Sequence, residues 1–302
     1  MTLSPQLVNH VGPVVPMTIF PERLCQIRHV ALDMDGTIYK GGTLFSFTLP
    51  FLAQLRRLGI GYSFLTNNPS KSVPDYLAHL GHMGLSATAD ELYTSAQATI
   101  DFLQTRRPAF RKLFVLGTPS MLAEFSRAGF ELTADSAQDQ PDAVVVGFDL
   151  TLAYARLCRA AWWIQQGKPF FATNPDRICP TDQPTVLVDC GSICAALVHT
   201  TGRQPDVVFG KPDPSMLSGI LNRHGLQSSQ IAMVGDRIYT DILMARRAGA
   251  LGVLVLSGEA TEADAIATSE ESRPDLLVPS LSEFGAQLLE AHANKPASRS
   301  LS

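Results

Sequence analysis

The stretch His29-Val30-Ala31-Leu32-Asp33-Met34-Asp35-Gly36-Thr37 runs a short apolar segment directly into two carboxylates, a glycine and a threonine. The apolar run has the length of a buried strand, and Gly36 supplies the permissive backbone that a sharp exit from a strand needs. Because side chains alternate along a strand, Asp33 and Asp35 should point the same way beyond its carboxyl end, where open α/β sheets bind ligands. Two carboxylates this close repel each other unless a cation or a shared proton compensates, which favours a site for a hard metal such as Mg²⁺.

The same residues could instead form an Asp- and Gly-rich turn that caps a helix. Average residue usage gives the pattern Asp-x-Asp-Gly-Thr by chance, in a chain of this length, on the order of once in several hundred proteins. That rarity favours the catalytic interpretation, although Asp-Gly turns are themselves common.

The bulk composition limits the classes of partner. The chain has 302 residues, of which 45% are hydrophobic and 17% charged, so it can bury one large core or two moderate ones, and we expect two domains. The formal net charge is −4 and no run of lysine and arginine occurs, which argues against a nucleic-acid partner. An anionic substrate would therefore need positive charge placed locally at its site.

Cysteine usage and the chain ends predict a reduced, cytoplasmic protein without a membrane segment. The five cysteines are scattered through a chain too large to need disulfides. Cys190 and Cys194 lie one helical turn apart, but no second Cys/His pair completes a zinc site, so we expect them to pack in a core. Prolines interrupt the first twenty residues and no basic segment precedes them, so we expect no signal peptide. No apolar stretch reaches membrane-spanning length, and residues 293–300 should form a frayed tail.

Strand-like apolar runs alternate with helical stretches along most of the chain. This alternation predicts an α/β fold with a Rossmann-like, doubly wound, mainly parallel sheet. The predicted strands cover residues 30–33, 61–66, 113–116, 143–147, 169–173, 207–209, 231–234 and 251–256. Thr118-Pro119 predicts the start of a helix that Gly129 ends, and residues 152–166 predict another helix. The buried stripe of this second helix would comprise Tyr154, Leu157, Cys158, Ala161, Trp162 and Gln165.

The polar strand ends are unevenly spaced. Asp33 and Thr66 are separated by about one strand–helix–strand unit, and so are Lys211 and Asp236. In contrast, the 144 residues 67–210 lie between the two pairs. Because that interval has its own strand–helix alternation, we predict an inserted α/β cap domain over residues 97–206, with residues 1–96 and 207–302 forming the core.

Three further polar motifs follow strand-like runs. Thr66-Asn67-Asn68 can donate hydrogen bonds to phosphate oxygens, and Lys211-Pro212 fixes one cation beside prolines. Asp236 and Asp241 follow the run 231–234 in the order Gly-Asp-Arg-Ile-Tyr-Thr-Asp. Each motif is weak alone, because Asn-Asn-Pro is an ordinary turn, a lysine before proline is usually solvated, and such aspartates can be helix caps.

Taken in order, the motifs Asp-x-Asp-Gly-Thr, Thr-Asn-Asn, Lys-Pro and Gly-Asp-x₄-Asp resemble those of the haloacid dehalogenase superfamily. The long insertion and the phrases Ala172-Thr173-Asn174-Pro175-Asp176 and Gly210-Lys211-Pro212-Asp213-Pro214 look like its subfamily IIA, typified by NagD and 4-nitrophenylphosphatase. The resemblance covers roughly residues 26–280. It implies a Rossmann-like core, a large α/β cap, Mg²⁺ dependence and hydrolysis of small phosphorylated metabolites.

The resemblance assigns a role to each motif position. Asp33 would be the nucleophile that forms an aspartyl-phosphate, and Asp35 would protonate the leaving oxygen and later deprotonate the attacking water. Mg²⁺ would be held by the carboxylates of Asp33 and Asp236 and by the backbone carbonyl of Asp35. Asp241 would lie behind these ligands and orient a water molecule or Lys211.

Binding of the substrate would fall to two groups of residues. In the core, Thr66, Asn67, Asn68 and Lys211 would bind the phosphoryl oxygens. In the cap, the contact loop 173–179 would reach the leaving group through Asn174, Arg177 and Cys179, and Arg177 would meet a second anionic group or remain an exposed surface residue. We also expect a homodimer formed through the cap.

Other functions fit parts of the pattern. A phosphosugar mutase would transfer the phosphoryl group to a sugar instead of water, and a dehalogenase would have no need for Asp35 or Asp236. A receiver-type signalling domain also clusters acids, a threonine and a lysine around Mg²⁺, but it would be shorter and would lack the insertion. A phosphometabolite sensor on the same fold would bind its ligand without turnover, since fold does not fix function.

Overall fold

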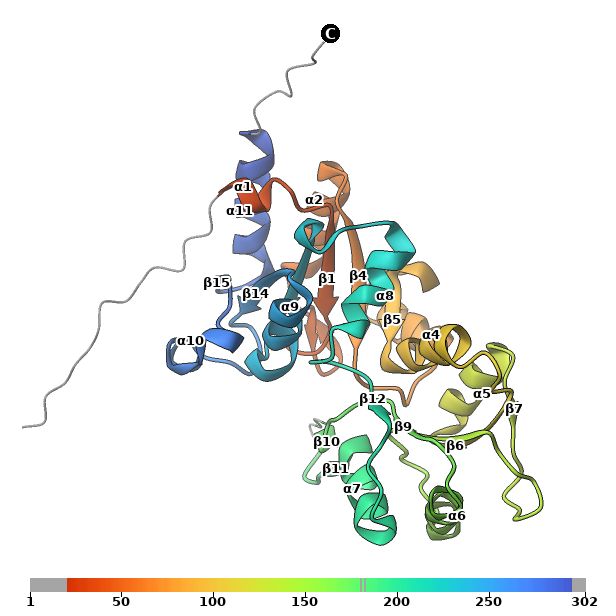
Figure 1. Cartoon of the computed structure of the whole chain (residues 1–302). Helices are drawn as coiled ribbons and strands as arrows, with labels where there is room; N and C mark the ends of the chain where they lie inside the picture. The colour runs from red at the N-terminus through yellow and green to blue at the C-terminus, as the bar shows by residue number, and fades with distance from the viewer. Residues whose placement is uncertain (1–20, 180, 182, 295–302) are drawn as a thin grey trace, which may run out of the picture.

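Strand β1 (His29–Asp33), which carries the quoted stretch, lies inside a six-stranded parallel sheet of order β15-β14-β13-β1-β4-β5 (Figure 1). The computed structural model describes residues 21–294 except 180 and 182, so the predictions for the first twenty residues and for most of the tail lie outside the described residues. The other strands of this core sheet are β4 (Gly61–Thr66), β5 (Leu92–Thr94), β13 (Ile231–Gly235), β14 (Leu251–Val255) and β15 (Leu276–Val278).

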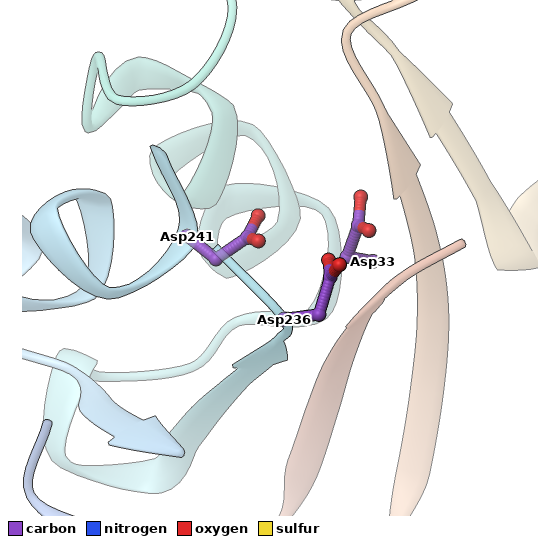
Figure 2. Close-up of side chains that lie close together, drawn as sticks. All are labelled: Asp33, Asp236 and Asp241. Carbon is purple, nitrogen blue, oxygen red and sulfur yellow. The ribbon is translucent and has the colours of Figure 1, made fainter. Parts of the chain in front are cut away.

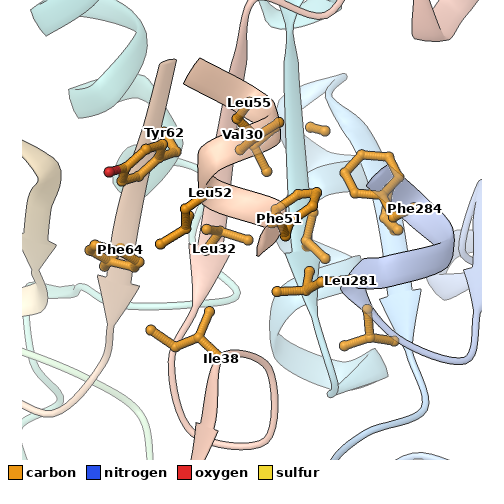
Figure 3. Close-up of a cluster of buried hydrophobic side chains, with 14 of the residues drawn as sticks. Val30, Leu32, Ile38, Phe51, Leu52, Leu55, Tyr62, Phe64, Leu281 and Phe284 are labelled. Atoms are coloured by element: carbon orange, nitrogen blue, oxygen red, sulfur yellow. The ribbon is translucent and has the colours of Figure 1, made fainter. Parts of the chain in front are cut away.

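Helices cover both faces of the core sheet because successive β1 side chains point to opposite sides. Val30 and Leu32 pack with residues of α2 and α11, as Figure 3 shows, whereas Ala31 packs with residues of α8 and α9. The flanking helices are α1 (Pro21–Leu24), α2 (Thr48–Leu58), α3 (Val73–His82), α8 (Ser215–His224), α9 (Leu243–Ala248), α10 (Glu262–Ala267) and α11 (Leu281–Ala293). Short helical turns are η1 (Ala89–Glu91), η2 (Ser228–Gln230), η3 (Ile238–Ile242) and η4 (Glu270–Ser272).

A second parallel sheet, of order β12-β9-β8-β6-β7, forms the inserted α/β domain that lies below the core in Figure 1. Val144 and Val146 of its central strand pack with residues of α6 and α7, while Val145 packs with residues of α4 and α5 on the other face. Its elements are β6 (Lys112–Leu116), β7 (Glu131–Leu132), β8 (Ala143–Val146), β9 (Phe170–Ala172), β12 (Val207–Val208), α4 (Ser95–Arg106), α5 (Pro119–Arg127), α6 (Tyr154–Gln165) and α7 (Cys190–Thr201). The predicted fold class is confirmed.

Two antiparallel hairpins complete the fold near the ends of the core strands. One pairs β2 (Tyr39–Lys40) with β3 (Thr43–Leu44) directly after the quoted stretch. The other pairs β10 (Ile178–Cys179) with β11 (Leu187–Val188) in the inserted domain. No helix in the described part of the chain is both long and apolar enough to cross a membrane.

Several details differ from the sequence prediction. Strands β5, β7 and β15 were not expected, because two or three residues give too short an apolar run to detect. On α6 the predicted stripe is only partly right. Leu157 and Ala161 pack partly buried against the core, but the fully buried side chains are Ala160, Trp163 and Ile164, while Tyr154 is 81% exposed. The helix turns another face to the sheet because its larger apolar contacts lie at Trp163 and Ile164.

The junctions between the two domains are continuous elements. The predicted boundary at 96/97 falls inside α4, whose residues Ala96 and Ile100 pack with the inserted sheet while Ala98 packs with the core. At the second junction, β12 pairs with β9 of the inserted sheet and ends with Val208, just past the predicted boundary at 206/207. The boundaries themselves stay a prediction.

Candidate active site

The carboxyl ends of β1, β4 and β13 meet at one edge of the core sheet, and each of them delivers a polar side chain. Asp33 is the last residue of β1, Thr66 is the last residue of β4, and Asp236 follows β13. The segment after β12 brings Lys211 to the same place, so that its ammonium contacts Asp33 across 178 residues of sequence. Parallel pairing of neighbouring strands therefore assembles the site from four distant segments.

Three buried carboxylates converge at this edge, as Figure 2 shows. Asp33, Asp236 and Asp241 each offer one oxygen, and these oxygens all lie within 4.8 Å of one another. Asp241 comes from the short π-helical turn η3, where the backbone N–H of Arg237 donates to its Oδ2 over 3.1 Å. The cluster thus draws on a strand end, a loop and a helical turn.

Two glycines make room for Asp236. Gly36, at φ 83°, and Gly258 both approach so closely that a Cβ on either would overlap the Asp236 carboxylate. The left-handed backbone of Gly36 also suits the turn that leaves β1. The glycine of the Asp-x-Asp-Gly-Thr motif is therefore required by space and by conformation.

Lys211 supplies the cation of the site and is almost fully buried. Its Nζ contacts Asp33 and lies 2.7 Å from Asp241 Oδ1. Burial alone would lower the pKa of Lys211, but the Asp241 and Asp33 carboxylates outweigh that effect and raise it. The side chain therefore stays an ammonium beside the proposed nucleophile.

Burial and mutual repulsion raise the pKa values of two of the clustered acids. Burial and the neighbouring Asp33 and Asp241 carboxylates raise the pKa of Asp236 to about 7. Burial raises the pKa of Asp241 to about 6, although Lys211 opposes this shift. A bound cation, in addition to the Lys211 ammonium, would stabilise the ionised form of these carboxylates.

The donor set fits a hard divalent cation. Asp236 Oδ1 is buried and accepts no hydrogen bond from the residues that the structure describes, while its Oδ2 accepts from the Glu259 backbone N–H at 2.8 Å. The hydroxyls of Thr37 and Thr240 are likewise buried without a described partner. A cluster of carboxylate oxygens with one unsatisfied acceptor matches the ligands that Mg²⁺ prefers.

Asp35 lies at the mouth of the site and its side chain is outside the acid cluster. The residue is exposed overall, yet partial burial of its carboxylate, followed by the Asp33 charge, raises its pKa above the ordinary value. Backbone N–H groups of Gly41 and Gly36 hydrogen-bond to it. A carboxyl that is held toward the open cavity with a raised pKa can both donate and accept a proton.

The loop after β4 is held by the segments on both sides of it. Asn67 Oδ1 accepts from the Lys211 backbone N–H at 2.6 Å, and Asn67 Nδ2 donates to the Lys211 carbonyl at 3.0 Å. Ser95 Oγ donates to the Asn67 carbonyl at 2.6 Å, and Tyr76 Oη donates to that of Asn68 at 2.8 Å. This network fixes the Thr66–Asn68 turn and the Lys211 backbone as one unit.

The inserted domain reaches the core through its loop 173–179. Asn67 Nδ2 lies 3.1 Å from Asp176 Oδ2, and Asn68 Nδ2 lies 3.5 Å from Cys179 Sγ. Asn174 is fully buried and its Nδ2 donates to the Asn67 carbonyl at 2.6 Å. The loop therefore forms the junction between cap and core.

Two of the predicted cap residues do not line the active-site cavity. Asn174 packs behind the loop, and Arg177 is exposed, with its carbonyl accepting from Ser192 Oγ at 2.7 Å. Cys179 does line the cavity. The arrangement gives Asn174 a role in joining the domains, and no substrate contact for Arg177 follows from it.

A cavity of about 640 Å³ opens over the acid cluster, and several residues that line it were not selected from the sequence. They are Tyr39, Lys40, Lys71, Tyr76, His79, Asp176, Asp189, Arg237 and Glu259. Arg237 Nε lies 2.9 Å from Glu259 Oε2. Asp176 and Arg237 stand inside quoted motifs and could have been selected for that reason, whereas Tyr39, Lys71 and His79 carry no signal at the level of sequence.

Comparison with known proteins agrees with this geometry. The sequence model described as haloacid dehalogenase-like hydrolase matches residues 30–131, and one described as HAD-hydrolase-like matches residues 208–284. The ribonucleotide monophosphatase NagD of Escherichia coli is 33% identical over 258 residues, which cover 85% of this chain and 98% of that protein.

Comparison with solved structures supports the same family. The 4-nitrophenylphosphatase of Thermotoga maritima has a TM-score of 0.81 at 36% identity, covering 87% of this chain and 98% of that one. A glycerol phosphate phosphatase of Mycobacterium tuberculosis, solved in complex with magnesium, has a TM-score of 0.79 at 31% identity, covering 85% of this chain and 77% of that one. The protein therefore belongs to the haloacid dehalogenase-like hydrolases, in the subfamily of NagD and 4-nitrophenylphosphatase.

Proposed function

We propose that this protein is an Mg²⁺-dependent phosphatase that hydrolyses small phosphomonoesters through an aspartyl-phosphate on Asp33. The observation that carries the proposal is the buried trio Asp33, Asp236 and Asp241 with the Lys211 ammonium between two of its members. A carboxylate at a strand end beside a fixed cation can attack a phosphoryl group whose charge is offset on the same side.

In the first step an Asp33 carboxylate oxygen attacks phosphorus while the bond from phosphorus to the ester oxygen breaks. Asp35 gives its proton to the departing oxygen, a role favoured by its raised pKa and its position at the cavity mouth. Lys211 and the donors of Thr66 and Asn67 bind the phosphoryl oxygens. The ammonium that pairs with Asp33 in the structure would then share its hydrogen bonds with the substrate.

In the second step Asp35 takes a proton from water, and the water oxygen attacks phosphorus. The bond between phosphorus and Asp33 breaks, which releases inorganic phosphate and restores the Asp33 carboxylate. Asp35 thus ends the cycle protonated and ready for the next ester.

Asp33, Asp236 and the Asp35 carbonyl would hold the Mg²⁺ ion, and Asp241 would hold Lys211 in place from 2.7 Å. When bound, the ion offsets the charge of the clustered acids and of the phosphoryl oxygens. The unsatisfied Asp236 Oδ1 supports this assignment.

The alternatives share this site and differ in the step after phosphoryl capture. A phosphosugar mutase needs a second sugar in place of water, and a sensor needs no turnover. The similar proteins reported above are named as phosphatases, which favours hydrolysis.

We also propose that the protein works in the cytoplasm and forms a homodimer through its cap. The thiols of Cys25, Cys158, Cys190 and Cys194, which form no disulfide among the described residues, support the compartment. Exposed apolar side chains of the cap, Leu150, Val186 and Val188, support the interface.

The test is release of inorganic phosphate from 4-nitrophenyl phosphate and from a panel of sugar, glycerol and nucleotide monophosphates, with Mg²⁺ or with a chelator. We expect turnover that needs Mg²⁺, and none from the Asp33→Asn variant. Absence of turnover on every ester by folded, Mg²⁺-supplied protein would favour the sensor.

A further inference from the structure

The proposed acid Asp35 marks the side of the cavity on which the leaving group lies. The Gly41 backbone N–H hydrogen-bonds to the Asp35 carboxylate, and Asp35 forms an isolated bridge with Tyr39. Both partners belong to the β2–β3 hairpin. If Asp35 protonates the departing oxygen, the alcohol it belongs to must extend toward this hairpin.

The hairpin and helix α3 form one continuous wall on that side. The rings of Tyr39 and His79 meet edge to face with centroids 5.9 Å apart. Lys71, just before α3, holds its Nζ 5.6 Å from the centroid of the Tyr76 ring. Tyr39, Lys71, Tyr76 and His79 all line the cavity, and Ile178 lines it from the cap.

This wall carries positive charge that the protein itself does not neutralise. Lys71 and Lys40 both line the cavity, yet neither forms an ion pair with a carboxylate among residues 21–294 as described. The lysine at the other end of the cavity, Lys211, is instead held by Asp33 and Asp241. A half-buried ammonium over an aromatic ring, without a carboxylate partner, can bind an anion.

We infer that Lys71, supported by Lys40, binds a second anionic group on the substrate, so that the preferred esters are those whose alcohol also carries a carboxylate. The inference rests on the proposed phosphatase activity and refines it. It places the second-anion site on the core wall beside Asp35, whereas the sequence left the cap residue Arg177 as either such a site or an exposed surface residue.

The test compares esters that differ only in that charge. One pair is 2-phosphoglycolate and 2-hydroxyethyl phosphate, and the second, longer by one carbon, is 3-phosphoglycerate and glycerol 1-phosphate. We expect the acidic member of at least one pair to have a kcat/KM about tenfold higher or more, through KM, because a charge-assisted hydrogen bond is gained. The preference should shrink as NaCl is added.

Lysine variants then test which side chain binds the carboxylate of the substrate. Lys71→Met should lower the acidic-to-neutral ratio of kcat/KM about tenfold, and Lys71→Arg should keep most of the preference. Lys168→Met removes a half-buried lysine of the cap that does not line the cavity, so it should leave the ratio unchanged.

Each outcome decides the inference. A ratio near one in both pairs for the unmodified enzyme overturns it, and so does a high ratio that survives both Lys71→Met and the double variant Lys40→Met/Lys71→Met. If the enzyme releases no phosphate even from 4-nitrophenyl phosphate, the proposed function fails first; if that ester is hydrolysed while neither pair shows a preference, only the second-anion site fails.

Discussion

The two walls of the cavity are built in different ways. On the core side, Asp33, Asp236 and Lys211 lie at the ends of buried strands or in segments fixed against them, and each is at most 9% exposed. On the cap side, the loop 173–179 leads into a strand of two residues, and Ile178 in it is 60% exposed. We conclude that the residues at the sheet edge determine which reaction occurs. The cap loop is less constrained by packing, so its residues can differ and select different leaving groups.

Among substitutions on the two sides of the cavity, Asp33→Asn on the core side should have the largest effect on turnover. The amide has the same shape but cannot attack phosphorus, so we expect kcat to fall at least about a thousandfold. The thermal midpoint should stay close to that of the unmodified protein. Steady-state kinetics with 4-nitrophenyl phosphate measure the effect, and a variant retaining about a tenth of the rate would exclude Asp33 as the nucleophile.

Lys211→Met should be nearly as damaging. It removes a cation from between Asp33 and Asp241, which should lower kcat by roughly a hundredfold or more. Leaving buried carboxylates unpaired should also cost about 3–5 kcal/mol of unfolding free energy.

A matched control is available in the inserted domain. Lys112 pairs with Glu131 and Asp139 at the surface, so Lys112→Met should barely change either the rate or the denaturation midpoint. Similar losses for the two lysine variants, measured by chemical denaturation and kinetics, would show that the position of Lys211 beside the acid cluster does not cause its effect.

The acid cluster should make the metal-free protein sensitive to pH. The folded pKa values of Asp236, about 7, and Asp241, about 6, lie above the unfolded value of 3.8. Their contribution to stability is therefore fully present below about pH 4 and is lost as pH rises through 6 and 7. With a chelator present, the thermal midpoint should fall by a few degrees between about pH 5 and pH 8.

Mg²⁺ should reverse that loss, because binding requires the deprotonated carboxylates. Its stabilising shift should be larger at pH 8 than at pH 5, and Asp236→Asn should flatten the chelator curve. Thermal scans at both pH values measure this, and an equal Mg²⁺ shift at the two values would speak against a cation bound by the cluster.

The smallest effect should come from the cap. Arg177 is exposed and does not line the cavity, so Arg177→Ala should change kcat/KM by less than about twofold on every ester tested. A loss confined to acidic esters would place the second-anion site on the cap loop and leave the Lys71 assignment without support.

The sequence predicted the core well because buried strands combine apolar runs with polar residues at their ends. Asp33, Thr66, Lys211 and Asp236 all appear at or shortly after the ends of such runs, and the structure brings them to one edge. The two-sheet architecture follows from the same alternation. The strands that were not expected, such as β5, β7 and β15, have only two or three residues.

The cavity wall could not be predicted, because its contacts join segments without a local pattern. The Tyr39–His79 contact links a hairpin to a helix, and the Asn67–Asp176 bond spans 109 residues. Asn174 and Arg177 belong to a recognisable sequence motif. Which side chains of this motif face the cavity depends on how the loop docks on the core.

The central claim is that Asp33 carries the phosphoryl group and that Asp35 moves the protons. The most direct measurement is rapid mixing of Asp35→Asn enzyme with 4-nitrophenyl phosphate, whose leaving group needs little protonation, followed by acid quenching and mass analysis of the peptide that contains Asp33. The account predicts a burst of one 4-nitrophenolate per active site and a peptide heavier by one phosphoryl group at Asp33. A burst-free time course with an unmodified Asp33 peptide, under conditions where the enzyme still turns over, would contradict it.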